Sequence, residues 1–122
     1  MKKILVVDDD ADILEVLHYI LTSHGFDVLT HLTGLDVPEV VMMYQPDLIL
    51  LDISLPGKSG TQVCSELKLI HTIPIILISA HSKEGKAFAE CNADAFIEKP
   101  FDMYELLNTI NVHLNKSPVS VA

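Results

Sequence analysis

The sequence predicts an α/β domain in which a five-stranded parallel sheet carries helices on both faces. Three short apolar runs, Ile4 to Val7, Leu48 to Leu51 and Ile75 to Ile78, show no alternation with polar residues, as is typical of strands buried on both sides. Segments with helical periodicity separate these runs, and 122 residues suffice for one such domain but not for two. Repeated strand–helix units give right-handed crossovers and a doubly wound sheet, for which we expect the strand order 2-1-3-4-5.

The first half of the chain is expected to contain two helices around a weaker strand. The first helix has Asp10 as its N-cap and is stopped by Gly25. A weaker strand is expected at Asp27 to Thr30. The second helix begins at Asp36, whose spacing to Glu39 is that of a capping box. The apolar stripe of the first helix consists of Ile13, Leu14, Leu17, Ile20, Leu21 and His24.

The second half of the chain is expected to add three helices and the last strand. Helical periodicity places the helices near Thr61 to Ile70, Lys83 to Cys91 and Met103 to Leu114, and a strand at Ala95 to Glu98. Asp102 is the predicted N-cap of the last helix. Together these elements complete the five strand–helix units that the fold class requires.

Charge and cysteine content exclude several functions. Acidic residues number 17 against 8 lysines, with no arginine, so the net charge is −9. We therefore expect neither nucleic acid nor a membrane as a direct partner. Cys64 and Cys91 lack the spacing of a metal site and are expected to be free, buried thiols of a cytoplasmic protein. The apolar run that starts at Ile4 ends at Asp8, too early for a signal peptide, and no run has the length of a membrane span.

The residues that follow the strands carry the candidate chemistry, because ligands of open α/β sheets bind beyond the carboxyl ends of the strands. Asp10 by itself is interpreted as a helix cap. Only the weaker strand at Asp27 to Thr30 ends without a candidate group. The other four strand ends are followed by Asp8, Asp9 and Asp10, by Asp52, by Ser79, and by Lys99.

Asp8, Asp9 and Asp52 together predict a metal site. Carboxylates about 5 Å apart repel each other by about 3 kcal/mol per pair at an effective dielectric of about 20. A sequence selected for stability alone would not gather three of them without a cation, and Mg²⁺ suits carboxylate oxygens best. Lys99 either pairs with these acids or holds a phosphoryl oxygen, and Ser79 is either a helix cap or a donor to the same oxygen. A carboxylate, a metal, an amine and a hydroxyl suit phosphoryl transfer.

Five stretches of the sequence resemble the receiver domain of bacterial two-component response regulators, the CheY-like family. The resemblance spans residues 2–115 and implies the flavodoxin-like, doubly wound fold with a cis peptide bond between Lys99 and Pro100. The stretches that carry it are Ile4 to Asp10, Pro46 to Asp52, Leu55-Pro56-Gly57 with Gly60, Ser79-Ala80, and Ala95 to Phe101.

The resemblance implies a role for each group of the cluster. Asp52 is implied to accept a phosphoryl group from the phosphohistidine of a sensor histidine kinase or a histidine phosphotransfer protein. Asp9, Asp52 and the backbone carbonyl of Ser54 are implied to bind Mg²⁺, and Asp8 to hold the ion mostly through water. Lys99 is implied to contact the phosphoryl group.

The resemblance also implies a switch. Ser79 would be drawn to the phosphoryl group and Phe96 would turn inward behind it, although Phe96 also fits an ordinary strand aromatic. The face formed by the fourth helix, the last strand and the last helix would then change its affinity for a downstream protein or output domain. Ser54 and His81 are candidates for tuning the loss of the phosphoryl group. Such a protein is a signalling switch rather than an enzyme, and a monomer or a phosphorylation-dependent dimer.

Other classes fit the sequence less well. A hydrolase of the haloacid dehalogenase type would use the Asp8-x-Asp10 pattern, but it leaves Asp52 unexplained. A flavodoxin-like carrier of FMN needs hydrogen-bond donors after the first strand, where the aspartates would repel its phosphate. A degenerate receiver that docks without phosphorylation remains the alternative within the family.

The domain is expected to cover residues 1–115, with 116–122 as a C-terminal tail or the start of a linker. Met1 directly before the first strand suggests a natural N-terminus, and the chain fits either a stand-alone regulator or the receiver of a longer protein. Two departures from the family pattern concern the region before the last strand. The stretch from Ser79 to Lys99 is shorter than usual, and Asn92 stands where glycine is common, which the left-handed region tolerates.

Overall fold

The computed structural model describes residues 1–80 and 91–115. Most of the helix predicted at Lys83 to Cys91, the predicted tail at 116–122 and the candidate residue His81 lie outside the described residues. Cys91 itself lies in a turn that leads into the last strand. Asn92, in the same turn, has a φ of 61°, so the left-handed conformation expected at this position is confirmed.

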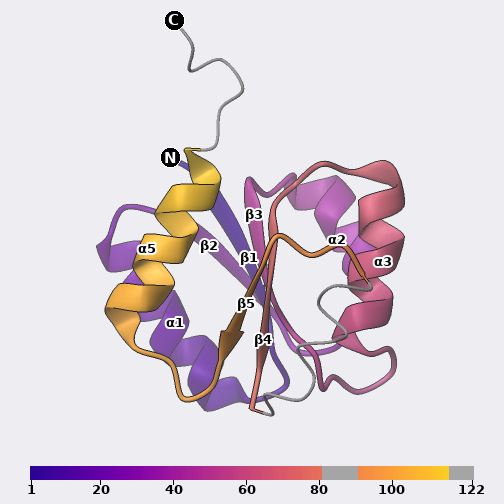
Figure 1. The fold of residues 1–122 in the computed structure, drawn as a ribbon, viewed down its shortest axis with the longest axis horizontal. Coiled ribbons are helices and arrows are strands. Elements are labelled where there is room, and N and C mark those ends of the chain that lie inside the picture. Colours follow the sequence, from indigo (N-terminus) through magenta and orange to yellow (C-terminus); the bar gives the residue numbers. More distant parts are fainter. Residues whose placement is uncertain (81–90, 116–122) are drawn as a thin grey trace, which may run out of the picture.

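The sheet has five parallel strands in the order β2-β1-β3-β4-β5, which confirms the predicted fold class (Figure 1). β1 is the second strand from one edge and aligns Val7 with His31 of β2 and with Leu51 of β3. All carboxyl ends therefore lie along one edge of the sheet. The strands are β1 (Lys3–Val7), β2 (Asp27–His31), β3 (Leu48–Asp52), β4 (Ile75–Ser79) and β5 (Ala95–Glu98).

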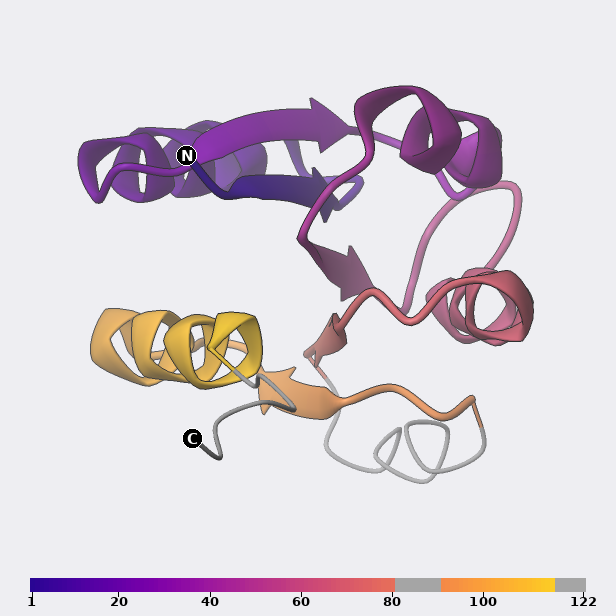
Figure 2. The same cartoon turned by 90° about the horizontal axis from the view of Figure 1, so that it is seen from above.

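Four helices of the described residues cover the two faces of the sheet. Figure 2 shows α1 and α5 on one face and α2 and α3 on the other. This arrangement follows from right-handed crossovers that change side along the sheet. The helices are α1 (Ala11–Ser23), α2 (Val37–Tyr44), α3 (Gly60–Ile70) and α5 (Met103–Leu114). None of the helices in the described part of the chain is long and apolar enough to cross a bilayer.

The continuous apolar runs are explained by burial on both faces of the sheet. Every side chain from Ile4 to Val7 and from Leu48 to Leu51 is at most 1% exposed. Ile4 and Val6 pack into the core under α1 and α5, whereas Leu5 and Val7 pack into the core under α2 and α3. Each such side chain contributes about 1.5–3 kcal/mol through burial. Cys64 and Cys91 are buried thiols in the second of these cores, as predicted.

Two helices begin at the predicted aspartate caps. The Asp10 carboxylate accepts hydrogen bonds from the backbone N–H of Asp12 at 2.9 Å and of Ile13 at 3.4 Å. The Asp102 carboxylate likewise accepts from the N–H of Tyr104 at 3.0 Å. These bonds satisfy N–H groups that have no partner within the helix.

Two predictions about helix ends are wrong. His24 does not lie on the buried stripe of α1, because the helix ends at Ser23 and His24 is an exposed C-cap residue before Gly25, which has a φ of 88°. Asp36 does not form a capping box with Glu39. Its φ of 61° is left-handed rather than extended, so its side chain makes no cap hydrogen bond.

Candidate functional site

Three carboxylates meet at the carboxyl edge of the sheet. Asp8 follows β1 directly and Asp52 is the last residue of β3, and both are buried, at 1% and 5% exposure. Asp9, the next residue after Asp8, is exposed. One oxygen from each of the three lies within 4.8 Å of the others. The sequence-based prediction that these acids converge is therefore correct.

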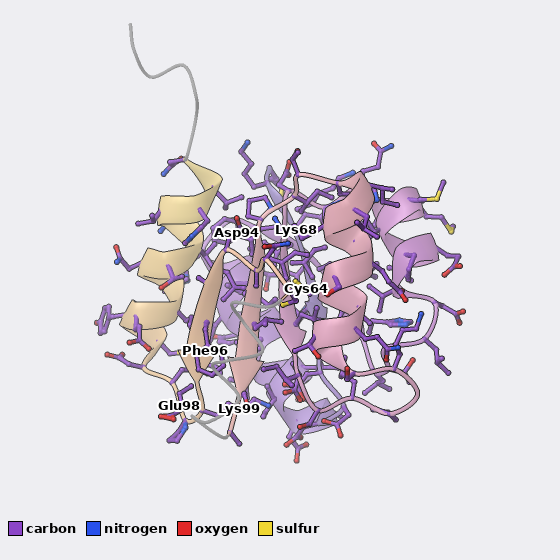
Figure 3. The ribbon with its side chains drawn as sticks, turned by 45° about the vertical axis from the view of Figure 1, so that its right-hand side comes forward. Cys64, Lys68, Asp94, Phe96, Glu98 and Lys99 are labelled. Carbon is purple, nitrogen blue, oxygen red and sulfur yellow. The ribbon has the colours of Figure 1, made fainter. Side chains whose placement is uncertain are left out.

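Lys99 brings its ammonium group to the same place from the loop after β5. Its Nζ lies 2.8 Å from Oδ2 of Asp8 and 3.5 Å from Oδ2 of Asp52. Figure 3 shows Lys99 just beyond the end of β5, next to Glu98. Its backbone N–H donates to the carbonyl of Ser79 at 2.7 Å, and the peptide bond between Lys99 and Pro100 is cis, as the resemblance implied.

Backbone N–H groups hold the two buried carboxylates in place. Oδ1 of Asp8 accepts from the N–H of Asp10 at 2.9 Å, and Oδ1 of Asp52 accepts from the N–H of Ser54 at 3.4 Å. Both oxygens of Asp8 therefore already have a donor, since Oδ2 faces Lys99. Asp52 has a weaker set of partners and is the less well satisfied of the two.

Burial and charge shift the protonation of this cluster. Burial, together with the negative charges of Asp8 and Asp9, raises the pKa of Asp52 from 3.8 to about 6, although Lys99 and the Ser54 N–H oppose the shift. For Lys99 burial alone would lower the pKa. The hydrogen bond to Asp8 and the charges of both acids outweigh burial, and the pKa of Lys99 is raised. Among the described residues, the single ammonium group of Lys99 thus faces three carboxylates and cannot neutralise all of their charge.

The donor set fits a hard divalent cation. Mg²⁺ prefers carboxylate and carbonyl oxygens and keeps several waters, so it is bound by few protein groups beside solvent. Here two buried carboxylates and one exposed carboxylate lie close enough to share an ion, and the exposed Asp9 leaves one side of the cluster open to water. Burial first, and then the neighbouring acids, raise the pKa of Asp52, so a cation bound here would stabilise its ionised form.

The other predicted site residues in the described part of the chain are Ser79, Phe96 and Ser54, and they differ in burial and in position. Ser79 is buried at the end of β4, whose residue Ile78 pairs with Asp52. Phe96 lies in the middle part of β5, opposite Leu77, and packs partly buried against the core under α2 and α3 (Figure 3). Ser54 is exposed in the loop after β3.

Gly60, which the sequence offered only as part of a motif, supports the site by closing the loop after β3. Its N–H donates to the carbonyl of Ile53 at 2.8 Å, which folds the loop after β3 back on itself. A Cβ at Gly60 would overlap the carbonyl oxygen of Asp52 and approach Cα of Ile53 to 2.8 Å. Only glycine permits this approach. The signal in the sequence was its position eight residues after Asp52, and the close approach itself arises only when the loop after β3 folds back on the strand.

Comparison with known proteins identifies the family. The sequence model of the response regulator receiver domain family matches residues 4–111, most of the chain. The chain belongs to the response regulator receiver domain family. The predicted receiver of a two-component system, CheY-like in fold, is thereby confirmed at the level of family.

Solved receiver domains show the same fold over nearly their whole length. The chain is similar to the BeF3-activated N-terminal receiver domain of RstA from Klebsiella pneumoniae, with 32% identity, a TM-score of 0.89, and 93% of this chain and 99% of that chain covered. It is also similar to the response regulator TrrA from Thermotoga maritima, in complex with Mg²⁺ and BeF, with 34% identity and a TM-score of 0.84. This match covers 91% of this chain and 97% of that chain. A CheY-like receiver domain protein from Methanospirillum hungatei is 29% identical with a TM-score of 0.88, and the match covers 95% of each chain.

Proposed function

We propose that this receiver domain is a phosphorylation switch in which Asp52 accepts a phosphoryl group from a histidine kinase or a histidine phosphotransfer protein. The observation that carries the proposal is the buried carboxylate of Asp52, crowded by Asp8 and Asp9 and reached by Lys99. Two similar receivers that contain beryllium fluoride support it. The domain acts as a signalling switch in the cytoplasm and catalyses only its own phosphorylation and dephosphorylation.

The transfer is a displacement at phosphorus. A carboxylate oxygen of Asp52 attacks in line and forms the new P–O bond, while the P–N bond to the donor histidine breaks. The electron pair of that bond stays on the imidazole nitrogen, which takes up a proton. The Lys99 ammonium and the Ser79 hydroxyl stabilise the charge on the equatorial oxygens, so the protein contributes mainly positioning and electrostatics.

Asp9, Asp52 and the backbone carbonyl of Ser54 would hold Mg²⁺. Asp8 would contribute mostly through water, because its two oxygens already accept from the Asp10 N–H and from Lys99. When bound, the ion neutralises the carboxylates and the oxygens of the incoming phosphoryl group. The Mg²⁺ in the TrrA complex supports this assignment.

The acyl phosphate then acts on the rest of the domain. It adds about −1.5 to −2 charge, which draws Lys99 away from Asp8 and brings Ser79 inward. Phe96 follows into the vacated space, and the surface around β5 and α5, together with the predicted fourth helix, changes its preference for a downstream protein or output domain. Ser54 and His81 tune how long the phosphoryl group remains.

Intact-protein mass spectrometry after incubation with acetyl phosphate and Mg²⁺ tests the proposal. We expect one added phosphoryl group in the wild type and in Asp94→Asn, a matched change of an aspartate at the opposite edge of the sheet. Asp52→Asn and a sample treated with EDTA should show none. If the wild type gains no phosphoryl group and does not bind beryllofluoride, the proposal is wrong and the domain is a degenerate receiver that docks without phosphorylation.

A further inference from the structure

The edge strand β2 has backbone groups that point away from the sheet. Within the described residues β2 pairs only with β1. The N–H of Asp27 donates to the carbonyl of Lys2 at 2.9 Å, and the carbonyl of His31 accepts from the N–H of Asp8 at 3.1 Å. The backbone groups of a strand point alternately to its two sides. The N–H and C=O groups of Val28 and Thr30 therefore face outward.

Neither helix beside β2 closes this edge. On the α1 side, Thr30 lines a hollow of about 560 Å³ together with Leu14 and His18. On the α2 side, Leu29 lines a hollow of about 330 Å³ together with Val40, Met43 and Tyr44. Figure 2 shows β2 at the outer edge of the sheet, with α1 and α2 on opposite sides of it. A further strand paired with β2 could therefore place its side chains in the hollow on the α1 side and in the hollow on the α2 side.

The strand also lacks two of the usual protections of an open edge. Edge strands are often blunted by lysine or proline, and the segment Asp27-Val28-Leu29-Thr30-His31 contains neither, with Asp27 at its start as its one charged residue apart from the titratable His31. Leu29 is 38% exposed and Met43, beside it in the hollow, is 86% exposed. By contrast β5, at the other edge, leads directly into Lys99 and Pro100.

We propose that β2 pairs antiparallel with β2 of a second copy of this chain, about a twofold axis at Leu29, so that the two sheets become one. In this register the outward groups of Val28 meet those of the partner's Thr30, and the same pair repeats across the axis. Such a pair exchanges two N–H···O=C bonds. The Leu29 side chain lies against the partner's Leu29 and enters the hollow beside Met43.

The side chains select this register. Directly opposite residues of an antiparallel pair share a face, so the Asp27 carboxylate lies next to the imidazole of the partner's His31 at both ends of the pair. In a register shifted by one residue, the outward N–H and C=O groups of Val28 would lie opposite the partner's Leu29, whose own N–H and C=O groups point toward β1. A shift by two residues leaves part of each strand unpaired and sets Asp27 or His31 opposite the partner's Leu29. The five residues are thus complementary to themselves.

The dimer is expected to be weak and independent of phosphorylation. A pairing of two five-residue strands buries less than the roughly 1,200 Å² of a stable interface. A net charge of −9 on each copy adds repulsion that salt screens. We therefore expect the dimer at concentrations on the order of 100 µM or above, and more of it at high ionic strength.

Sedimentation velocity on the full chain without phosphodonor tests the proposal from about 10 µM to about 1 mM, the range of a small interface. We expect Leu29→Lys, which sets two like charges across the axis, to raise the dimer Kd at least about tenfold. Leu69→Lys, on the exposed outer side of α3 at 84% exposure, makes the same chemical change elsewhere and should leave the Kd unchanged. A wild type that stays monomeric throughout, or a dimer that Leu69→Lys also abolishes, overturns the proposal.

Two further variants examine the backbone and the register. Thr30→Pro removes an outward N–H, a change that an edge strand tolerates, and should abolish the dimer while circular dichroism stays unchanged. Leu29→Cys should form a disulfide-linked dimer under mild oxidation, because opposed residues at the axis approach within disulfide range. Leu69→Cys serves as its control. A dimer that survives Thr30→Pro, or the absence of the Leu29→Cys cross-link, would mean that the copies do not pair through β2 in this register.

Discussion

Aspartates at the two ends of the sheet have different surroundings. At the amino edge, Asp94 accepts from the Lys68 ammonium at 2.6 Å and from the Ile75 N–H at 2.8 Å, and Asp47 accepts from the Lys3 N–H at 2.7 Å. At the carboxyl edge Asp8, Asp9 and Asp52 lie together, and among residues 1–80 and 91–115 only the Lys99 ammonium forms ion pairs with them. Figure 3 shows the pair Lys68 and Asp94 toward the start of β5, with Lys99 at its end.

The difference separates structural acids from functional ones. At the amino edge Asp94 has an ammonium and a backbone N–H as donors, so its charge is compensated and it stabilises the fold. The acids of the carboxyl edge carry more negative charge than their donors compensate. Burial and this charge raise the pKa of Asp52 to about 6, which means that its ionised form is destabilised in the fold. Uncompensated charge of this kind is retained for binding or chemistry rather than for stability.

The largest expected effect is a loss of stability at the amino edge. Asp94→Ala leaves the Ile75 N–H without its acceptor. It also removes the carboxylate from Lys68, which is 14% exposed and keeps its hydrogen bond to the Ile73 carbonyl at 3.0 Å. We expect the free energy of unfolding to fall by about 2–4 kcal/mol, measured by urea denaturation. Asp94→Asn keeps an acceptor oxygen and should lose less. Equal losses in the two variants, or a loss below about 0.5 kcal/mol in Asp94→Ala, would contradict the structural role.

At the carboxyl edge the corresponding change should stabilise the protein. The pKa of Asp52 is raised from the ordinary value of 3.8 to about 6 in the folded state, so its ionisation destabilises the fold progressively between these two pH values and by the full amount above about 6. Asp52→Asn is expected to gain about 1–3 kcal/mol at pH 7. The gain should shrink as the pH falls from 6 to 4, where wild-type Asp52 becomes protonated in both states. Urea denaturation at several pH values measures it. A destabilised variant at pH 7 would show that Asp52 is a structural acid.

The smallest expected effect is stabilisation by Mg²⁺ alone. An ion that binds only the folded state at ten times its Kd stabilises the protein by about 1.4 kcal/mol, which raises the melting temperature by several degrees. Thermal unfolding with and without MgCl₂ measures this shift. Asp94→Asn should respond as the wild type does, and Asp52→Asn should respond less. The same shift in Asp52→Asn would place the ion away from the candidate site.

Much of the fold followed from local patterns. The three apolar runs predicted the central strands because burial on both faces leaves no polar period, and Asp10 and Asp102 predicted helix starts because their caps are local. The N-cap geometry of Asp36 was not predictable, since its left-handed φ is set by the loop that joins β2 to α2. His24 was misplaced because helical periodicity does not show where the last turn ends.

The sequence by itself determined the fold class, the strand order and the convergence of the acids, because parallel strands place their carboxyl ends at one edge whatever the details of packing. Only the tertiary structure decided which charges are satisfied. Asp8 and Lys99 lie 91 positions apart, and their 2.8 Å contact depends on the packing of the whole sheet. The fit of Gly60 against Asp52 and the open edge of β2 were decided in the same way. Distances between residues remote in the chain are set by packing, which no local pattern encodes.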